Sequence, residues 1–337
     1  VPFGHKEMLA KKKSVKSGTE NDVNLNVSGA VNISSGATLL GDFANITAGS
    51  IGVLGHYNAT TADTNITEGN FSNSGSFTHN AGRVILGGGT SENQSITGSN
   101  ETTFFNLNIT NGVVNTTIEQ NTTVEGVLDI ANSAGLILDA TDKNVVLSFG
   151  NDSGGLSRMI LTGGLRFAGN SANHVTIQGR NAMHHPFIRP INNILFRTGG
   201  SGSVINLKWL DLIDNGANTI NTGGAGVTLN ITGNISRKSW LLVISAGDTF
   251  NATQPDTNIS APGGNVDDLQ LVGTTNIIGG MGKPIVFNKF DILEFTGTGP
   301  YYMQYVTIDS GGATGGALFS ISNANPVITK IDNITVI

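Results

Sequence analysis

A run of short alternating segments between Gly69 and Thr110 constrains the fold of this chain more than any other feature. Within each segment apolar residues occupy every second position, and Gly, Asn or Ser closes the segment. The apolar residues concerned are Phe71, Phe77, Val84, Leu86, Phe105, Leu107 and Ile109. Alternation with a period of two between turn residues predicts short strands that bury one face.

Three pieces of this stretch also resemble a known style of repeat. They read GNFSNSGSF, GRVILGG and QSITGSNETTFFNLNIT. They are similar to the repeat units of filamentous-haemagglutinin-like and adhesin-like surface proteins, most clearly over residues 69–138. The resemblance implies an all-β fold, a right-handed parallel β-helix (β-solenoid), and it indicates little about a ligand.

Internal similarity points the same way. The segment NVSGAVNISSGATLL (26–40) is echoed by TVEGVLDIANSAGLIL (123–138), which aligns Val27–Ile33 with Val124–Ile130. The segment GVTLNITGNI (226–235) is a weaker third copy. Units of this size cannot bury an apolar face alone, so we expect them to stack on one another.

The predicted organisation is a basic N-terminal arm, residues 1–20, followed by a β-solenoid over residues 21–337. Within the solenoid we expect a loop excursion near 180–200, where two Pro interrupt the strand pattern, and a terminal strand near 326–337. The first 16 residues hold five Lys and one Glu, whereas the whole chain carries a net charge of −6. A basic arm could bind the acidic surface of another copy or an anionic cell surface, or it could be a solvated tail.

Composition narrows the class of protein. Charged residues make up 12% of the 337 residues, there are 46 Gly, and Cys is absent. Gly and Asn are poor helix formers, which argues against a helical enzyme. The 38% of hydrophobic residues, arranged with a period, argue against disorder. A secreted protein without disulfides would be held by its hydrogen-bond ladder and packing, although a cytosolic protein can lack Cys too.

N-glycosylation sequons are abundant and predict an extracellular or cell-surface location. The 39 Asn and the 62 Ser and Thr would give roughly 7 sequons by chance, but the chain has 17. They lie at Asn26, Asn32, Asn45, Asn58, Asn65, Asn70, Asn93, Asn100, Asn108, Asn115, Asn121, Asn151, Asn230, Asn234, Asn251, Asn258 and Asn333. The alternative is that Asn at turns and Thr in strands form these triplets incidentally. Asn stacked in register would also form side-chain ladders, and a buried ladder Asn could not carry sugar.

The chain ends in alternating apolar residues without a polar cap, so its last strand would expose unpaired backbone groups. We expect subunit contacts at the two ends, formed by Lys11, Lys12, Lys13, Val327, Ile328, Ile331, Ile334 and Val336. Three interpretations stay open: head-to-tail assembly through a terminal strand or arm, a sequence that stops inside a longer β-helix, and a monomer with a folded-over cap.

Candidate catalytic and metal-binding residues are few. Asp267 and Asp268 are adjacent and would point to opposite faces of a strand, and Asp211 and Asp214 are equally ambiguous. His184 and His185 have no third ligand at a recognisable spacing. The glycine runs lack the Lys-Ser/Thr of a phosphate loop. We therefore expect no catalytic, cofactor-binding or metal site, no nucleic-acid partner and no transmembrane segment.

These observations predict a structural subunit of a cell-surface filament, sheath or stalk whose partners are copies of itself. The first alternative is an adhesin or glycan-binding module that acts through the 180–200 or 245–265 loops. Five of the seven Arg fall in a sequon-free stretch, 152–229, which would suit a protein contact. The second alternative is a β-helical polysaccharide lyase or hydrolase.

Overall fold

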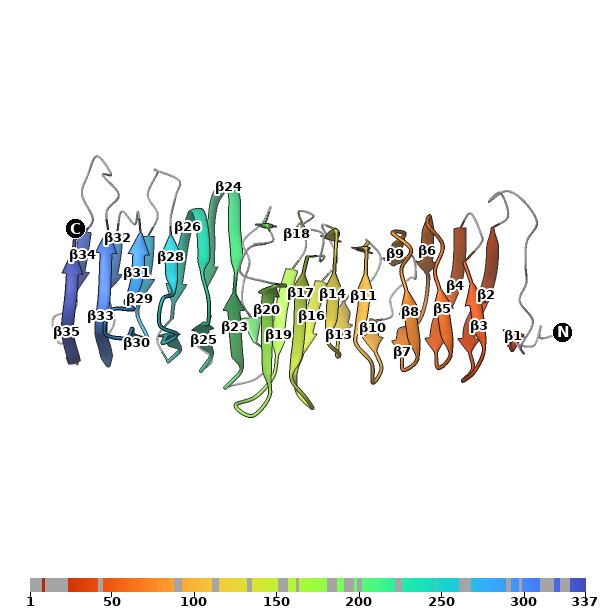
Figure 1. The fold of residues 1–337 in the computed structure, drawn as a ribbon, viewed down its shortest axis with the longest axis horizontal. Helices are drawn as coiled ribbons and strands as arrows, with labels where there is room; N and C mark the ends of the chain where they lie inside the picture. Colours follow the sequence, from red (N-terminus) through yellow and green to blue (C-terminus); the bar gives the residue numbers. More distant parts are fainter. Residues whose placement is uncertain are drawn as a thin grey trace. The chain divides into compact units, whose positions relative to one another are not determined.

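A computed structural model describes the following residues: 8–9, 24–41, 45–87, 93–110, 115–131, 135–150, 157–161, 164–180, 187–190, 197–198, 202–221, 226–245, 247–260, 268–288, 292–296, 299–309, 318–321 and 328–337. The regular elements of these residues are all strands (Figure 1). They form two compact units, Val1–Asp139 with Val145–Gly164, and Ala140–Asn144 with Leu165–Ile337.

The strands of the first unit are β1 (Met8–Leu9), β2 (Leu25–Ile33), β3 (Thr38–Leu40), β4 (Asn45–Val53), β5 (His56–Asn58), β6 (Asp63–Ile66), β7 (Phe71–Asn73), β8 (Ser76–Thr78), β9 (Arg83–Leu86), β10 (Gln94–Thr97), β11 (Thr102–Phe104), β12 (Asn106–Ile109), β13 (Thr116–Ile118), β14 (Thr122–Val124), β15 (Val127–Ile130), β16 (Gly135–Asp139), β17 (Val145–Phe149) and β18 (Arg158–Leu161).

The strands of the second unit are β19 (Gly164–Ala168), which begins one residue before the boundary, β20 (His174–Gly179), β21 (Phe187–Pro190), β22 (Arg197–Thr198), β23 (Val204–Lys208), β24 (Leu210–Asn221), β25 (Thr228–Ile231), β26 (Ile235–Ile244), β27 (Thr249–Ala252), β28 (Asn258–Ser260), β29 (Asp268–Leu271), β30 (Thr274–Ile278), β31 (Ile285–Asn288), β32 (Ile292–Phe295), β33 (Tyr301–Asp309), β34 (Leu318–Ile321) and β35 (Ile328–Val336).

Pairing in the first unit is parallel and regular. Strand β9 pairs with β12 and β12 with β15, while β10 pairs with β13 and β11 with β14, so the partner lies three strands further along the chain. Such pairing makes the chain coil, and each coil places three strands beside those of the coil before. This is an all-β fold of parallel strands, compatible with the predicted β-solenoid.

The core of the first unit is a set of columns in which one residue per coil points inward. One column runs Ile51, Phe71, Ile96, Ile118 and Leu138, each at most 1% exposed. Burial alternates along each strand, as the sequence pattern predicts. Removal of these apolar side chains from water is the main stabilising contribution to the unit.

One part of the predicted alternation is wrong. Phe105 is half-buried and stacks on His79 with ring centroids 5.7 Å apart, whereas its neighbour Phe104 is fully buried. The reason is that Phe105 lies at the corner between β11 and β12, where the alternation starts afresh. Phe77 is half-buried as well, and its ring lies against Phe71 at 5.1 Å.

Corners between strands depend on glycine. Gly98 connects β10 to β11 with φ at 126°, a conformation that side-chain-bearing residues rarely adopt, and a Cβ there would collide with the carbonyl oxygen of Asn73. Tyr57 in β5 is fully buried, and its hydroxyl forms a hydrogen bond with the Thr64 hydroxyl at 3.0 Å.

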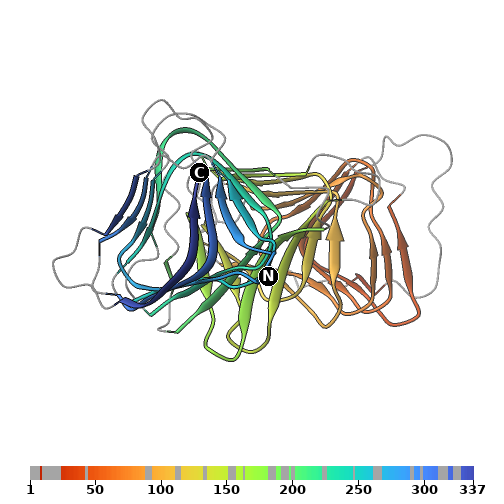
Figure 2. The same ribbon diagram turned by 60° about the vertical axis from the view of Figure 1, so that its left-hand side comes forward.

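Pairing in the second unit is also parallel, with partners two or three strands apart, as in β23–β25 and β27–β30. The strands of this unit curl around a common interior (Figure 2), and one inward column runs Ile205, Leu229, Phe250, Thr275 and Tyr301. These five residues are at most 1% exposed. Strand β35 pairs with β33 along one edge.

The predicted arm, 1–20, lies outside the described residues except for Met8–Leu9, which pair with Val31 and Asn32 of β2. The predicted excursion at 180–200 contains β21 and β22, and the rest of it after Arg180 also lies outside the described residues.

Candidate functional site: outward asparagine columns and the last strand

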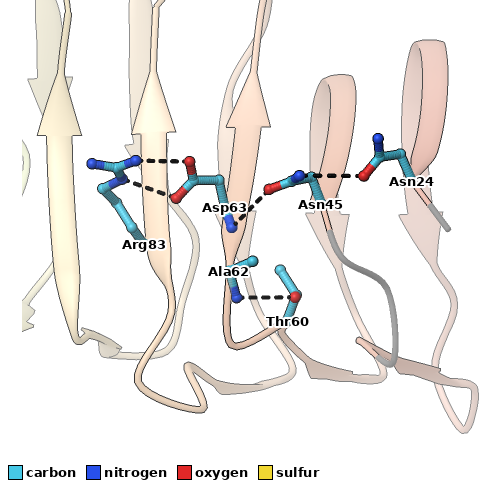
Figure 3. Close-up of polar contacts among 6 residues, drawn as sticks. All are labelled: Asn24, Asn45, Thr60, Ala62, Asp63 and Arg83. Carbon is cyan, nitrogen blue, oxygen red and sulfur yellow. Dashed lines mark hydrogen bonds and ion pairs between the residues drawn. The ribbon is translucent and has the colours of Figure 1, made fainter. Parts of the chain in front are cut away.

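Outward side chains of the first unit form a polar row that crosses neighbouring strands, from Asn24 at the right of Figure 3 to Arg83 at its left. Asn45 Nδ2 donates to Asn24 Oδ1 at 3.2 Å, and the Asp63 backbone N–H donates to Asn45 Oδ1 at 3.2 Å. Asp63 then accepts two bonds from Arg83, Nε at 2.9 Å and Nη2 at 2.7 Å. The strand register places Asn45, Asp63 and Arg83 side by side on successive coils.

The Asp63–Arg83 pair is the forked arrangement that carboxylates and guanidinium groups favour. The hydrogen bonds that Arg83 donates to Asp63 raise the pKa of Arg83. Both side chains are partly exposed, 44% for Arg83 and 31% for Asp63, so solvent screening keeps the contribution of the pair to stability small. The turn before β6 is fixed nearby, where the Ala62 N–H donates to Thr60 Oγ1 at 3.1 Å.

A second use of asparagine recurs where strands begin. The Oδ1 of Asn70 accepts the Ser95 N–H at 2.8 Å, and the Oδ1 of Asn121 accepts the Val146 N–H at 3.0 Å. The same bond joins Asn106 to Val127, and Asn234 to Asn258, both at 2.9 Å. These amides satisfy backbone donors at strand starts in the next coil, which gives Asn a structural role at turns.

The second unit carries an asparagine ladder, defined here as Asn206, Asn230, Asn251 and Asn276. The Nδ2 of each of the last three donates to the Oδ1 of the Asn in the preceding coil, and all three bonds are 2.8 Å long. At the first rung Asn206 donates to Thr176 Oγ1 at 3.1 Å. The register puts the four Asn on consecutive coils.

Sequence reasoning considered ladders in general and missed these members. Asn206 and Asn276 lie in no sequon, so a search for sequons passes over them. A signal was present in the three segments TLNIT, TFNAT and TTNII, which start at Thr228, Thr249 and Thr274 and share an Asn at the third position. Their spacing matches consecutive coils in the structure.

None of the predicted sequon Asn that the structure describes is buried. Those exposed are Asn26, Asn32, Asn70, Asn93, Asn100, Asn121 and Asn333. Those half-buried are Asn45, Asn58, Asn65, Asn108, Asn115, Asn230, Asn234, Asn251 and Asn258. Asn151 lies outside the described residues. Their accessibility alone does not select among them, but their hydrogen bonds differ.

The predicted subunit-contact residues are only partly described. Lys11, Lys12, Lys13 and Val327 lie outside the described residues, and of Ile328 the backbone alone is described, as the first residue of β35. Further along the same strand, Ile331 is 38% and Val336 60% exposed, and Ile334 is half-buried. The strand therefore presents large apolar side chains to solvent.

The acidic and histidine candidates form no described cluster. Asp211 and Asp214 belong to β24, where the backbone alone is described, and Asp267, His184 and His185 lie outside the described part. Within that part, no three His, Asp or Glu side chains are grouped to hold a metal ion. A search of the same residues finds no helix with the length and apolar character to cross a membrane.

Comparison with protein-family models, curated protein sequences and solved structures found no match to this chain. No family is shown. The resemblance to haemagglutinin-like repeats stays a prediction made from three sequence segments, and any function has to be argued from the geometry above.

Proposed function

We propose that this protein is a structural subunit of an extracellular filament, sheath or stalk, built as a right-handed β-helix and assembled head to tail from copies of itself. The observation that carries the proposal is the outer edge of β35. Among the described strands only β33 pairs with it, and Ile331, Val336 and Ile337 stand 38%, 60% and 69% exposed along it.

An open strand edge with apolar side chains favours the addition of another strand. The first unit offers a complementary strand. Strand β2 is nine residues long, as is β35, and β1 pairs with only Val31 and Asn32 of it on that side. Residues Leu25–Ala30 of one copy could therefore continue the sheet beyond β35 of another copy.

Location outside the cell is supported by the 17 sequons, and N-linked glycans are part of the proposal. The open apolar edge of β35 is the feature that favours a structural role over a glycan-binding module or a polysaccharide lyase or hydrolase.

The test is the assembly state of the purified chain as its concentration rises, measured by sedimentation velocity and negative-stain electron microscopy. Val336→Lys places a charge on the open edge and is expected to stop assembly. Leu54→Lys is the matched control, because Leu54 is 63% exposed in a turn between β4 and β5 and belongs to neither proposed contact segment, Leu25–Ala30 or β35.

Assembly by the Leu54→Lys variant together with a monomeric Val336→Lys variant would support the proposal. A wild-type chain that stays monomeric at high concentration would refute it, and so would filaments formed equally well by both variants.

A further inference from the structure

Five of the sequons have the same tripeptide, Asn-Ile-Thr, starting at Asn45, Asn65, Asn108, Asn230 and Asn333. The first four all lie on outward positions of parallel strands and all are half-buried. A preference of the modifying enzyme for one acceptor tripeptide over another cannot separate them. Differences that remain after each site is compared with its own peptide must come from the folded chain.

Hydrogen bonds divide the four into two pairs. At Asn45 and Asn230 both amide atoms are engaged: Asn45 Nδ2 bonds Asn24 and its Oδ1 bonds the Asp63 N–H. Asn230 Nδ2 bonds Asn206, and its Oδ1 accepts from Asn251. The side chains of Asn65 and Asn108 make no hydrogen bond to another described residue.

The sequon threonines do not produce this division. Thr67 donates to the Ala48 carbonyl at 3.2 Å, Thr110 to the Leu86 carbonyl at 3.4 Å, and Thr232 to the Leu207 carbonyl at 3.4 Å. The hydroxyl that follows Asn65, Asn108 or Asn230 is therefore held in the same way, and only the state of the asparagine amide differs.

We infer that Asn65 and Asn108 are glycan acceptors, whereas Asn45 and Asn230 are structural amides that the fold withholds from glycosylation. The inference rests on the proposed glycoprotein and specifies which of its sites are used. In the transfer, Asn Nδ2 forms a bond to the anomeric carbon of an oligosaccharide, the bond from that carbon to a lipid diphosphate breaks, the diphosphate leaves, and one Nδ2 proton passes to the enzyme. Nδ2 must turn toward the enzyme for this, and at Asn230 that movement breaks two ladder bonds.

The acceptors also have room along the fold. The register aligns Asn26, Thr47, Asn65, Ile85 and Asn108 in one outward column. Sequon asparagines thus occupy alternate coils, separated by Thr47 and Ile85. Neighbouring strands lie about 4.8 Å apart, so successive acceptors are about 9.6 Å apart. Glycans would form a single row on this face of the first unit.

The test uses unglycosylated, folded protein treated with an oligosaccharyltransferase and its lipid-diphosphate-linked oligosaccharide. Occupancy at each site is measured over time by mass spectrometry of proteolytic peptides. Synthetic peptides that span each sequon give the reference rate without folded structure. For each site, the rate in the folded protein is divided by the rate in its peptide. We expect this ratio to be at least about tenfold higher at Asn65 and Asn108 than at Asn45 and Asn230, because breaking two hydrogen bonds costs more than about 1.4 kcal/mol, which corresponds to a factor of ten.

Two variants test the cause without altering a sequon. Asn206→Ala removes the acceptor of Asn230, and Asn24→Ala removes that of Asn45, so each is expected to raise modification of its partner severalfold. Asn24 is exposed and precedes β2, so we expect the Asn24→Ala variant to fold. It therefore remains informative if Asn206→Ala unfolds the protein.

Equal relative rates at all four sites would overturn the inference. The inference would also be overturned if Asn65 and Asn108 stayed unmodified in the folded protein while their peptides were modified. A third contrary outcome is an Asn24→Ala variant in which modification of Asn45 does not increase. Site-selective transfer to a chain that never assembles would refute the proposed filament and leave this inference standing.

Discussion

Removal of one rung from the asparagine ladder should cost more in its middle than at its end. Asn230→Ala deletes the bond donated to Asn206 and the bond accepted from Asn251, both 2.8 Å long. Asn276→Ala deletes only the bond that Asn276 donates to Asn251. At about 0.5–1.5 kcal/mol per net hydrogen bond, the first change should lower the free energy of unfolding by about 2 kcal/mol and the second by about 1 kcal/mol.

The comparison is controlled because both substitutions replace the same residue type by Ala at outward, half-buried positions of parallel strands. Differences in strand propensity and side-chain size therefore cancel to first order. The assay is urea unfolding followed by circular dichroism, with amide hydrogen exchange of β23, β25 and β27 as a local readout. Equal shifts of the midpoint for Asn230→Ala and Asn276→Ala, or no shift for either, would refute the ladder as a source of stability.

Three further perturbations test the core, the corners and a buried hydroxyl. Burial raises the pKa of Tyr57 to about 12, against a hydrogen bond that lowers it, so the unfolded chain loses this proton from about pH 10 while the folded chain keeps it. The free energy of unfolding should therefore fall by about 1.4 kcal/mol per pH unit between pH 10 and pH 12. Urea midpoints measured in parallel for Tyr57→Phe should lack this pH-dependent loss of stability. Gly98→Ala should destabilise the protein by about 1–3 kcal/mol or more, because Gly98 has a positive φ and an added Cβ would collide with Asn73. Gly29→Ala should be tolerated, because no atom lies within 4 Å of the Cβ it would add. Thermal melts that rank the two variants the other way would contradict the corner assignment. Phe104→Ala removes a fully buried ring and should lower the unfolding free energy by about 3–5 kcal/mol in urea titrations, and a loss below 1 kcal/mol would show that the column is not packed as described.

Much of the strand content, and many of the residues that point into the core, could be predicted from the alternation of apolar and polar residues alone. Phe71, Val84, Leu86, Leu107 and Ile109 are all buried as the pattern indicates. Period two is a local property of extended backbone, so it can be seen in a few residues. It does not show where a coil turns a corner, which is why Phe105 was assigned to the wrong face in place of Phe104.

Register could not be predicted from the internal echo. The alignment of Val27–Ile33 with Val124–Ile130 pairs Val31 with Leu128, but in the structure the column of Leu128 leads through Leu107, Val84, Thr64 and Ile46 to Leu25. The echo is therefore six residues out of structural register. Coils differ in loop length, and pairing between coils depends on those lengths rather than on the similarity of two segments.

The candidate site was predictable in kind and not in detail. Sequons marked the right residue type, since Asn230 and Asn251 do belong to the ladder. The distinction between an engaged amide and a free one depends on residues one coil away, such as Asn24 and Asn206, which lie 21 and 24 positions from Asn45 and Asn230 in sequence. No window short enough to define a strand contains both partners.

The ladder has a direction, because every member donates toward the preceding coil, and Asn206, Asn230 and Asn251 accept from the following one. Such a row has translational symmetry. Excision of one whole coil, from just after Asn230 through Asn251, would bring Asn276 to the position now held by Asn251, and the donor–acceptor order would be restored. Duplication of a coil would insert a rung with the same polarity. The second unit can therefore change its length in whole coils, in evolution or by engineering, without an unmatched amide at the junction.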